Sequence, residues 1–316
     1  MTIFFKPSLL LLVLSMCINF SALAQTDIDA NMMGKNSFCT GFVYANSSWK
    51  NYWEGINKRE NLNLGTVSTQ SVSFVGNYGI TNKLNVLVGL PYVKTRASAG
   101  YMSGLDGLQD VSLWAKYQPI EKNVGRGILS LFTIGGVTLP TNKYVTDYLP
   151  LSIGLGSTNA SLRVMADYQL LNWFATTSYT YVLRSNIKLD RTSYYTTTLH
   201  NTNEVAMPNA SQVNVRAGYR SPRLVAEAVF NKWTTLGGFD ITKNNMPFPS
   251  NRMNATTAGV NFKYSLTKVE KFSVTGGANY VLAGRNVGQT TSLYGGVLLL
   301  MDFTHSPKKT KVSSSK

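Results

Sequence analysis

One segment of the chain reads Leu84-Asn85-Val86-Leu87-Val88-Gly89-Leu90-Pro91-Tyr92, and its even-numbered positions are all large and apolar. Such alternation, with a period of two residues, is typical of a β-strand with two different faces. The same pattern returns in 110–117, 162–169 and 213–220, where an apolar stripe alternates with a more polar one. A helical period is nowhere sustained, so the sequence predicts an all-β fold.

The alternating segments number about twelve and have about ten residues each. They are 38–46, 67–79, 84–94, 108–118, 127–139, 158–169, 173–183, 211–220, 224–233, 254–264, 271–282 and 291–303. The connections between them are in turn long (47–66, 95–107, 140–157, 184–210, 234–253 and 283–290) and short (80–83, 119–126, 170–172, 221–223 and 265–270). Short turns at one end and long loops at the other are typical of an outer-membrane β-barrel.

Backbone hydrogen bonding favours the same architecture. Lipid offers no partners to N–H and C=O groups, so strands can span a bilayer only when the sheet closes on itself. We therefore expect a transmembrane antiparallel up-and-down β-barrel of about 12 strands, with both termini on the periplasmic side. The mean hydropathy of −0.06 agrees with alternating lipid-facing and lumen-facing residues. It is too low for a bundle of membrane helices, each of which needs about 20 mainly apolar residues.

The ends of the chain divide into short segments around the barrel. Residues 1–24 read as a signal peptide, with Lys6, an apolar stretch at 8–20 and a small-x-small cleavage pattern before Gln25. A lipoprotein alternative at Cys17 is disfavoured because the bulky Met16 precedes it. Residues 25–37 form a short N-terminal periplasmic segment that either enters the barrel or stays outside, 38–303 form the barrel, and 304–316 form a disordered basic tail. Without the leader only Cys39 remains, which excludes an intramolecular disulfide.

The formal net charge is +15, although only 14% of the residues are charged. Basic charge can indicate nucleic acid, but here many basic residues are scattered over turns, loops and the tail, so no nucleic-acid partner is expected. Anionic lipopolysaccharide in the surrounding outer-membrane lipid suits exposed basic loops better. The further partners expected are a small-molecule solute and the barrel-assembly machinery of a Gram-negative cell.

Two stretches resemble a known family. Asn77–Tyr92 contains Tyr-Gly-Ile-Thr followed by Gly-Leu-Pro-Tyr, and Gly107–Tyr117 has the spacing Gly-x-x-Asp before a final Lys-Tyr. Both resemble motifs of the outer-membrane barrels grouped as the "Putative MetA-pathway of phenol degradation" family. The resemblance implies an outer-membrane barrel and uptake of small hydrophobic or aromatic compounds, and it brings no binding residues with it. The chain departs from the pattern by continuing for thirteen residues beyond the aromatic Phe303.

If the apolar stripes face lipid, the opposite stripes place a set of mostly charged side chains in the lumen. These lumen-facing candidates are Asp110, Trp114, Lys116, Arg163, Asp167, Arg216, Arg220, Glu227 and Lys263. In one interpretation the charges pair across the barrel and fill it. In the other they line a pore that prefers anionic or polarised solutes. The first is preferred because charges of both signs are present.

The sequence thus predicts a passive channel or transporter rather than an enzyme. One alternative is a structural or adhesive barrel that presents the loop 184–210, which is rich in Tyr, Thr and Asn. Another is an outer-membrane phospholipase that uses His200, for which no partner serine can be named. The only histidines are His200 and His305, so no metal site or other cofactor is expected.

Overall fold

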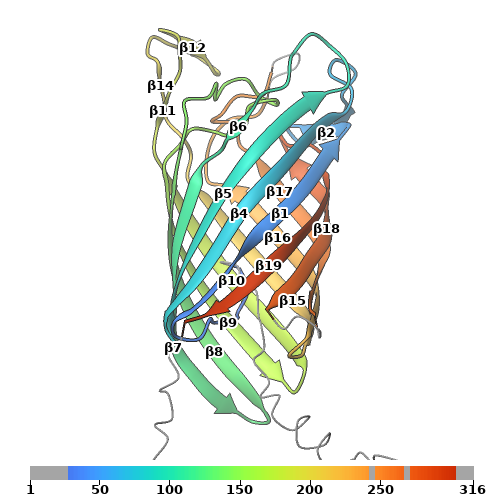
Figure 1. Ribbon diagram of the computed structural model, residues 1–316. Helices are drawn as coiled ribbons and strands as arrows, with labels where there is room; N and C mark the ends of the chain where they lie inside the picture. Colours follow the sequence, from blue (N-terminus) through green and yellow to red (C-terminus); the bar gives the residue numbers. More distant parts are fainter. Residues whose placement is uncertain (1–27, 242–245, 267–270, 304–316) are drawn as a thin grey trace, which may run out of the picture.

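The computed structural model describes residues 28–241, 246–266 and 271–303, and within them twelve long strands form one closed antiparallel barrel (Figure 1). The proposed signal peptide (1–24) and basic tail (304–316) lie outside the described residues. The barrel strands are β1 Ser37–Trp49, β4 Val67–Thr81, β5 Leu84–Ala97, β7 Val111–Val124, β8 Gly127–Leu139, β9 Asn159–Leu170, β10 Trp173–Arg184, β15 Ala210–Arg220, β16 Leu224–Thr235, β17 Asn254–Ser265, β18 Phe272–Arg285 and β19 Thr291–Asp302. The predicted fold class is confirmed.

Closure comes from the first strand, which pairs with β4 on one side and with β19 on the other. The β1–β19 register runs without interruption from Ser37↔Asp302 to Ser48↔Thr291. All neighbouring barrel strands are antiparallel, so hydrogen bonds run round the whole wall and no strand edge is exposed.

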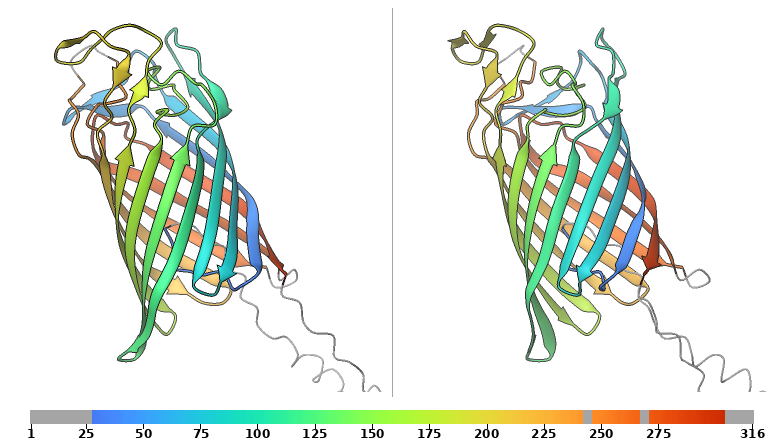
Figure 2. Two further views of the ribbon diagram at one scale, coloured as in Figure 1. Left: turned by 90° about the vertical axis from the view of Figure 1, so that its left-hand side faces the viewer. Right: turned by 60° about the vertical axis from the view of Figure 1, so that its left-hand side comes forward.

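The two ends of the barrel differ as the sequence predicts (Figure 2). At the turn end, strands are joined by 82–83, 125–126, 171–172, 221–223 and 266–271. At the loop end they are joined by 50–66, 98–110, 140–158, 185–209, 236–253 and 286–290. The loops contain short strands that the alternation pattern did not predict: β2 Asn51–Glu54, β3 Asn57–Glu60, β6 Asp106–Leu108, β11 Ile187–Lys188, β12 Tyr194–Tyr195, β13 Leu199–His200 and β14 Glu204–Val205.

One predicted boundary is wrong. The sequence suggests a turn over 119–126, but the β7–β8 hairpin continues to a two-residue turn at 125–126. Pro119 has no N–H to donate, and it lies where the register shifts between Tyr117 and Ile120. The bulge absorbs the proline, and Gly125 supplies the positive φ of 61° that the tight turn needs.

The wall of the barrel reverses the usual distribution of polar and apolar side chains. On β9, Leu162 and Val164 point outward with 57% and 54% of their surface exposed, whereas Arg163 and Asp167 are buried in the interior. Exposed Tyr and Trp side chains such as Tyr168 and Trp173 lie near the strand ends. This arrangement suits an apolar outer face in lipid and a polar interior. Within the described residues there is no helix long and apolar enough to cross a membrane.

Residues 28–36, here called the N-terminal segment, enter the barrel from the turn end and lie inside it. Asn36 N donates to Gly79 O at 2.8 Å where the segment meets β4. The contact requires glycine at this position, because a Cβ on Gly79 would lie 2.0 Å from Gly34 O. Of the two arrangements the sequence leaves open, the segment adopts the one inside the barrel.

Candidate functional site

The barrel interior holds all the lumen-facing candidates except Asp110. Trp114 is partly buried against the interior cluster, and the other side chains are at least nine-tenths buried: Lys116, Arg163, Asp167, Arg216, Arg220, Glu227 and Lys263. Each projects from the face opposite the lipid-facing stripe of its strand. The period-two alternation alone therefore indicates on which face of the wall they lie.

Asp110 lies just before β7 at the loop end, where it accepts a hydrogen bond from the Tyr144 hydroxyl. Burial raises the pKa of the Asp110 carboxyl, and the hydrogen bond from Tyr144 opposes that rise. Gly156 N donates to the same hydroxyl oxygen at 3.2 Å. Asp110 thus ties the loop 140–158 to the rim of the barrel rather than lining its middle.

The N-terminal segment is fixed to the wall by a buried ion pair. Lys116 Nζ lies 3.1 Å from Asp29 Oδ1 and donates to Asn31 O at 3.2 Å. Next to this pair, Ala30 packs on Phe132, Ile134 and Met165, and Met33 packs on Cys39 and Leu298. Polar and apolar contacts together hold the segment across the lumen near the turn end.

A second ion pair joins β9 to β15 across the intervening strand β10. Arg220 donates through Nη1 to Asp167 Oδ2 at 3.0 Å and through Nη2 to Oδ1 at 3.2 Å. Thr176 donates to the same carboxylate at 2.5 Å, and the guanidinium lies 3.8 Å from the centre of the Phe174 ring. The two parallel hydrogen bonds and the face of the Phe174 ring together stabilise the buried guanidinium of Arg220.

Arg163 donates hydrogen bonds to two neutral side chains. Its Nε donates to Thr180 Oγ1 at 2.6 Å and its Nη2 to Gln212 Oε1 at 3.4 Å. The five interior basic groups therefore lie among three interior acids, Asp29, Asp167 and Glu227, within the described chain. The interior is positive on balance, and much of its charge is paired.

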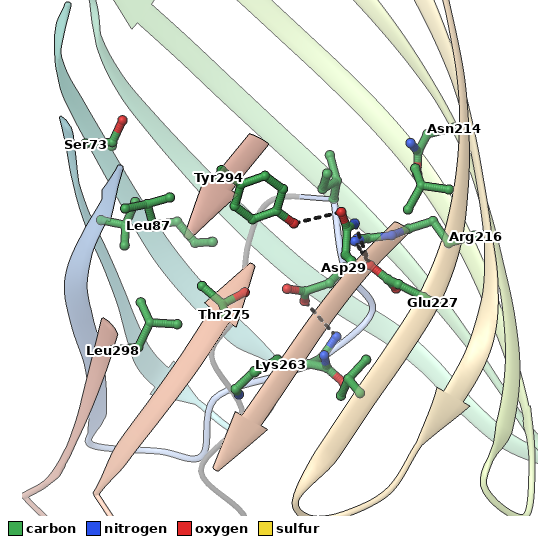
Figure 3. Close-up of a pocket in the computed structure, with 18 of the residues that line it drawn as sticks. Asp29, Ser73, Leu87, Asn214, Arg216, Glu227, Lys263, Thr275, Tyr294 and Leu298 are labelled. Carbon is green, nitrogen blue, oxygen red and sulfur yellow. Dashed lines mark hydrogen bonds and ion pairs between the residues drawn. The ribbon is translucent and has the colours of Figure 1, made fainter. Parts of the chain in front are cut away.

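Above the N-terminal segment the lumen opens into a cavity of about 560 Å³ (Figure 3). One wall is apolar and includes Leu87 of β5, Val75 of β4 and Leu298 of β19. The facing wall is polar and includes Asn214, Arg216, Glu227, Asn261, Lys263 and Tyr294. The cavity can therefore hold a molecule that has an apolar body and a polar group.

The polar wall is organised by a chain of hydrogen bonds across four strands. Tyr294 Oη donates to Asn261 Oδ1 at 2.7 Å, and Asn261 Nδ2 donates to Glu227 Oε1 at 2.9 Å. Glu227 also pairs with Arg216 Nη2. The sequence reasoning missed Asp29, Asn261 and Tyr294 as interior residues. For Asn261 and Tyr294 the alternation around Val260, Phe262 and Leu293 could have indicated them; for Asp29 no local pattern exists.

No group of three or more metal-ligating side chains occurs within residues 28–241, 246–266 and 271–303. His200 lies in the loop 185–209, where its ring stacks on Tyr194 with centroids 4.8 Å apart. Its Nε2 hydrogen-bonds Thr196 Oγ1 at 2.9 Å. The imidazole is thus part of the packing of this loop.

A closed wall of twelve strands, an apolar exterior and a polar lumen define a transmembrane β-barrel of the outer-membrane type. The chain belongs to the family described as "Putative MetA-pathway of phenol degradation", whose sequence profile matches residues 61–294. The resemblance noted in the sequence is thereby confirmed. No curated protein matches the chain significantly.

Solved barrels share the architecture. A COG4313 outer membrane channel from Pseudomonas putida F1 is 14% identical, with a TM-score of 0.67 over 88% of this chain and 100% of that chain. The translocator domain of the autotransporter NalP from Neisseria meningitidis is 12% identical, with a TM-score of 0.46 over 83% of this chain and 87% of that chain. At such identities the likeness to the COG4313 channel concerns the fold alone.

Proposed function

We propose that this protein is a passive outer-membrane channel that takes up small hydrophobic or aromatic compounds, with its loop end facing out of the cell. The observation that carries the proposal is the interior cavity of about 560 Å³. Its volume falls within the range of about 300–1,000 Å³ that small-molecule sites have. A barrel that served only as a scaffold would have no need for such a space.

The lining of the cavity supports the class of solute. Leu87, Val75 and Leu298 form an apolar wall of the cavity, opposite its polar wall. Burying an apolar ring against this wall is favourable by about 25 cal/mol per Å². The description of the family, which refers to phenol degradation, agrees with an aromatic solute. The COG4313 barrel is itself an outer membrane channel.

Transport rather than catalysis suits the polar groups of the lumen. The interior acids are engaged by basic partners, as in Asp29–Lys116, Asp167–Arg220 and Glu227–Arg216. His200, the residue that a phospholipase would need, is stacked on Tyr194 in a loop. We therefore infer that the protein acts on its solutes by binding and passage alone.

The test is uptake of radiolabelled phenol by cells with an intact outer membrane, with and without this protein. Ser73 lines the cavity, and Ser73→Trp would fill it with a large side chain. We expect the variant to lower uptake to the level of cells that lack the protein. The control is Leu162→Trp on the lipid-facing side, which should leave uptake unchanged.

Folding of both variants is checked by the shift in gel mobility between unheated and boiled samples. If cells with the wild-type protein take up phenol no faster than cells without it, the proposed function is wrong. Equal uptake through a correctly folded Ser73→Trp variant would place the route outside this cavity.

A further inference from the structure

Arg216 on β15 is a basic residue of the cavity lining whose hydrogen-bond donors are only partly satisfied by the protein. Only 6% of the residue is accessible to solvent, and its Nη2 is paired with Glu227 Oε1. Its Nε and Nη1 are buried without a hydrogen-bond partner in the part of the chain that the structure describes. Buried polar atoms are nearly always hydrogen-bonded, so two unsatisfied donors on one guanidinium indicate that another molecule supplies the acceptors.

Among the described residues, no neighbour of Arg216 supplies those acceptors. Glu227 Oε1 already accepts from Asn261 Nδ2 at 2.9 Å, and Asn261 Oδ1 accepts from Tyr294 Oη at 2.7 Å. The hydrogen-bond chain holds Glu227 in place, and the Arg216 side chain lines the cavity on its polar wall (Figure 3). An oxygen of a molecule in the cavity is therefore the natural acceptor.

The charge around the cavity favours an anionic oxygen. Lys263 of β17 projects from the same wall as Arg216, and Arg220 also lines the space. Three basic side chains therefore border the cavity, against the two acids Asp29 and Glu227. Glu227 neutralises one of them through the direct pair. Hydrogen bonds between a guanidinium and a carboxylate are about twice as strong as those between neutral groups.

The opposite wall of the cavity indicates the chemistry of the rest of the ligand. Leu87 and Leu298 lie across the cavity from Arg216 and offer a surface for an apolar body (Figure 3). We propose that the cavity is a binding site for small aromatic or aliphatic carboxylates, with Arg216 binding the carboxylate and the apolar body lying against Leu87 and Leu298. The inference rests on the proposed function, since it names the class of solute for the same cavity.

The experiment is calorimetric titration of the purified protein in lipid nanodiscs, with empty nanodiscs as the baseline. The probes are benzoate and its neutral relative benzyl alcohol. We expect benzoate to bind roughly ten-fold or more tightly than benzyl alcohol. Arg216→Gln should weaken benzoate by a similar factor and change benzyl alcohol little.

Arg163→Gln is the matched control. Arg163 is an equally buried interior arginine, but its donors are directed to Thr180 and Gln212 and it lies outside the cavity lining. Glu227→Gln gives a prediction of opposite sign, because removing the counter-charge should make benzoate bind several-fold more tightly. If Arg216→Gln does not fold because Glu227 is left unpaired, the double variant Arg216→Gln/Glu227→Gln keeps the site neutral and tests the same loss.

The outcomes separate this inference from the proposed function. Equal affinity for benzoate and benzyl alcohol, or an unchanged benzoate affinity in a folded Arg216→Gln or double variant, would overturn the inference even if phenol uptake is observed. Preferential benzoate binding that is lost with Arg216 supports it even if the cells show no uptake, in which case the transport proposal alone is wrong.

Discussion

Lys116 Nζ on the barrel wall lies 3.1 Å from Asp29 Oδ1 of the N-terminal segment, and the lysine is completely buried. Removing one partner of such a pair leaves the other as an uncompensated buried charge, which is strongly unfavourable. The pair therefore ties the position of the N-terminal segment to the wall of the lumen. We therefore expect conduction through the lumen to depend on that tie.

Replacing Lys116 with methionine should loosen the N-terminal segment. Asp29 would lose its ion pair with Lys116, so the segment should leave the lumen more often and a small sugar should enter liposomes several-fold faster. Liposome swelling measures the rate. Lys35→Met changes an exposed lysine of the same segment and should have no effect. An unchanged rate in a folded Lys116→Met barrel would mean that the apolar contacts alone hold the segment.

The accessibility of Cys39 measures the same movement of the N-terminal segment. Its side chain is buried against Met33 and Leu298, so it is covered by the N-terminal segment. Apart from Cys17, it is the only cysteine of the chain. We expect a maleimide to label the folded wild-type protein slowly, the Lys116→Met variant faster and the boiled protein completely. Rapid labelling of the folded wild type would contradict the seating of the segment.

Asp167→Asn should destabilise the barrel by about 3–5 kcal/mol, because it leaves the buried Arg220 without its carboxylate. Urea unfolding in detergent micelles, followed by tryptophan fluorescence, measures the loss. The control is Arg191→Gln, which removes the more exposed pair to Asp147 at 2.7 Å in the loops. That change should stay below about 1 kcal/mol. Equal effects of the two substitutions would show that burial does not matter here.

The loop end should loosen in acid. Hydrogen bonds from Arg285 lower the pKa of the Asp240 carboxyl from its ordinary value of 3.8 to about 2. A folded-state pKa below the unfolded value contributes stability that is complete well above pH 3.8 and is lost as the pH falls from 3.8 towards about 2. Both side chains are about one-third exposed, so the contribution is below about 1 kcal/mol.

Pepsin cleavage measures this effect, since the enzyme works in the same pH range. Cleavage in 236–253 should rise up to about five-fold more than enzyme activity alone explains. Asp240→Asn should already be susceptible and should lack this extra rise. If cleavage of the Asp240→Asn variant still rises in this way as the pH falls, a titratable group other than Asp240 causes the rise.

The strands are predictable because alternation is a local property of the chain. Leu162 and Val164 predict an outward stripe on β9, and the structure has them exposed with Arg163 buried between them. The sequence suggests a turn over 119–126 because Pro119 and the charged residues after it interrupt the pattern. A bulge between Tyr117 and Ile120 restores the pairing, and only the neighbouring strand β8 provides it.

Which face each strand residue occupies follows from the period of two, because consecutive side chains on a strand point in opposite directions. Which partner each charged side chain meets depends instead on closure of the barrel wall and on the N-terminal segment that enters the lumen. Asp29 lies in a segment with no alternation, 87 residues before Lys116, and meets it only once the barrel has closed around the segment. The cavity between Arg216 and Leu87 is likewise a product of that closure, since it joins side chains from opposite walls.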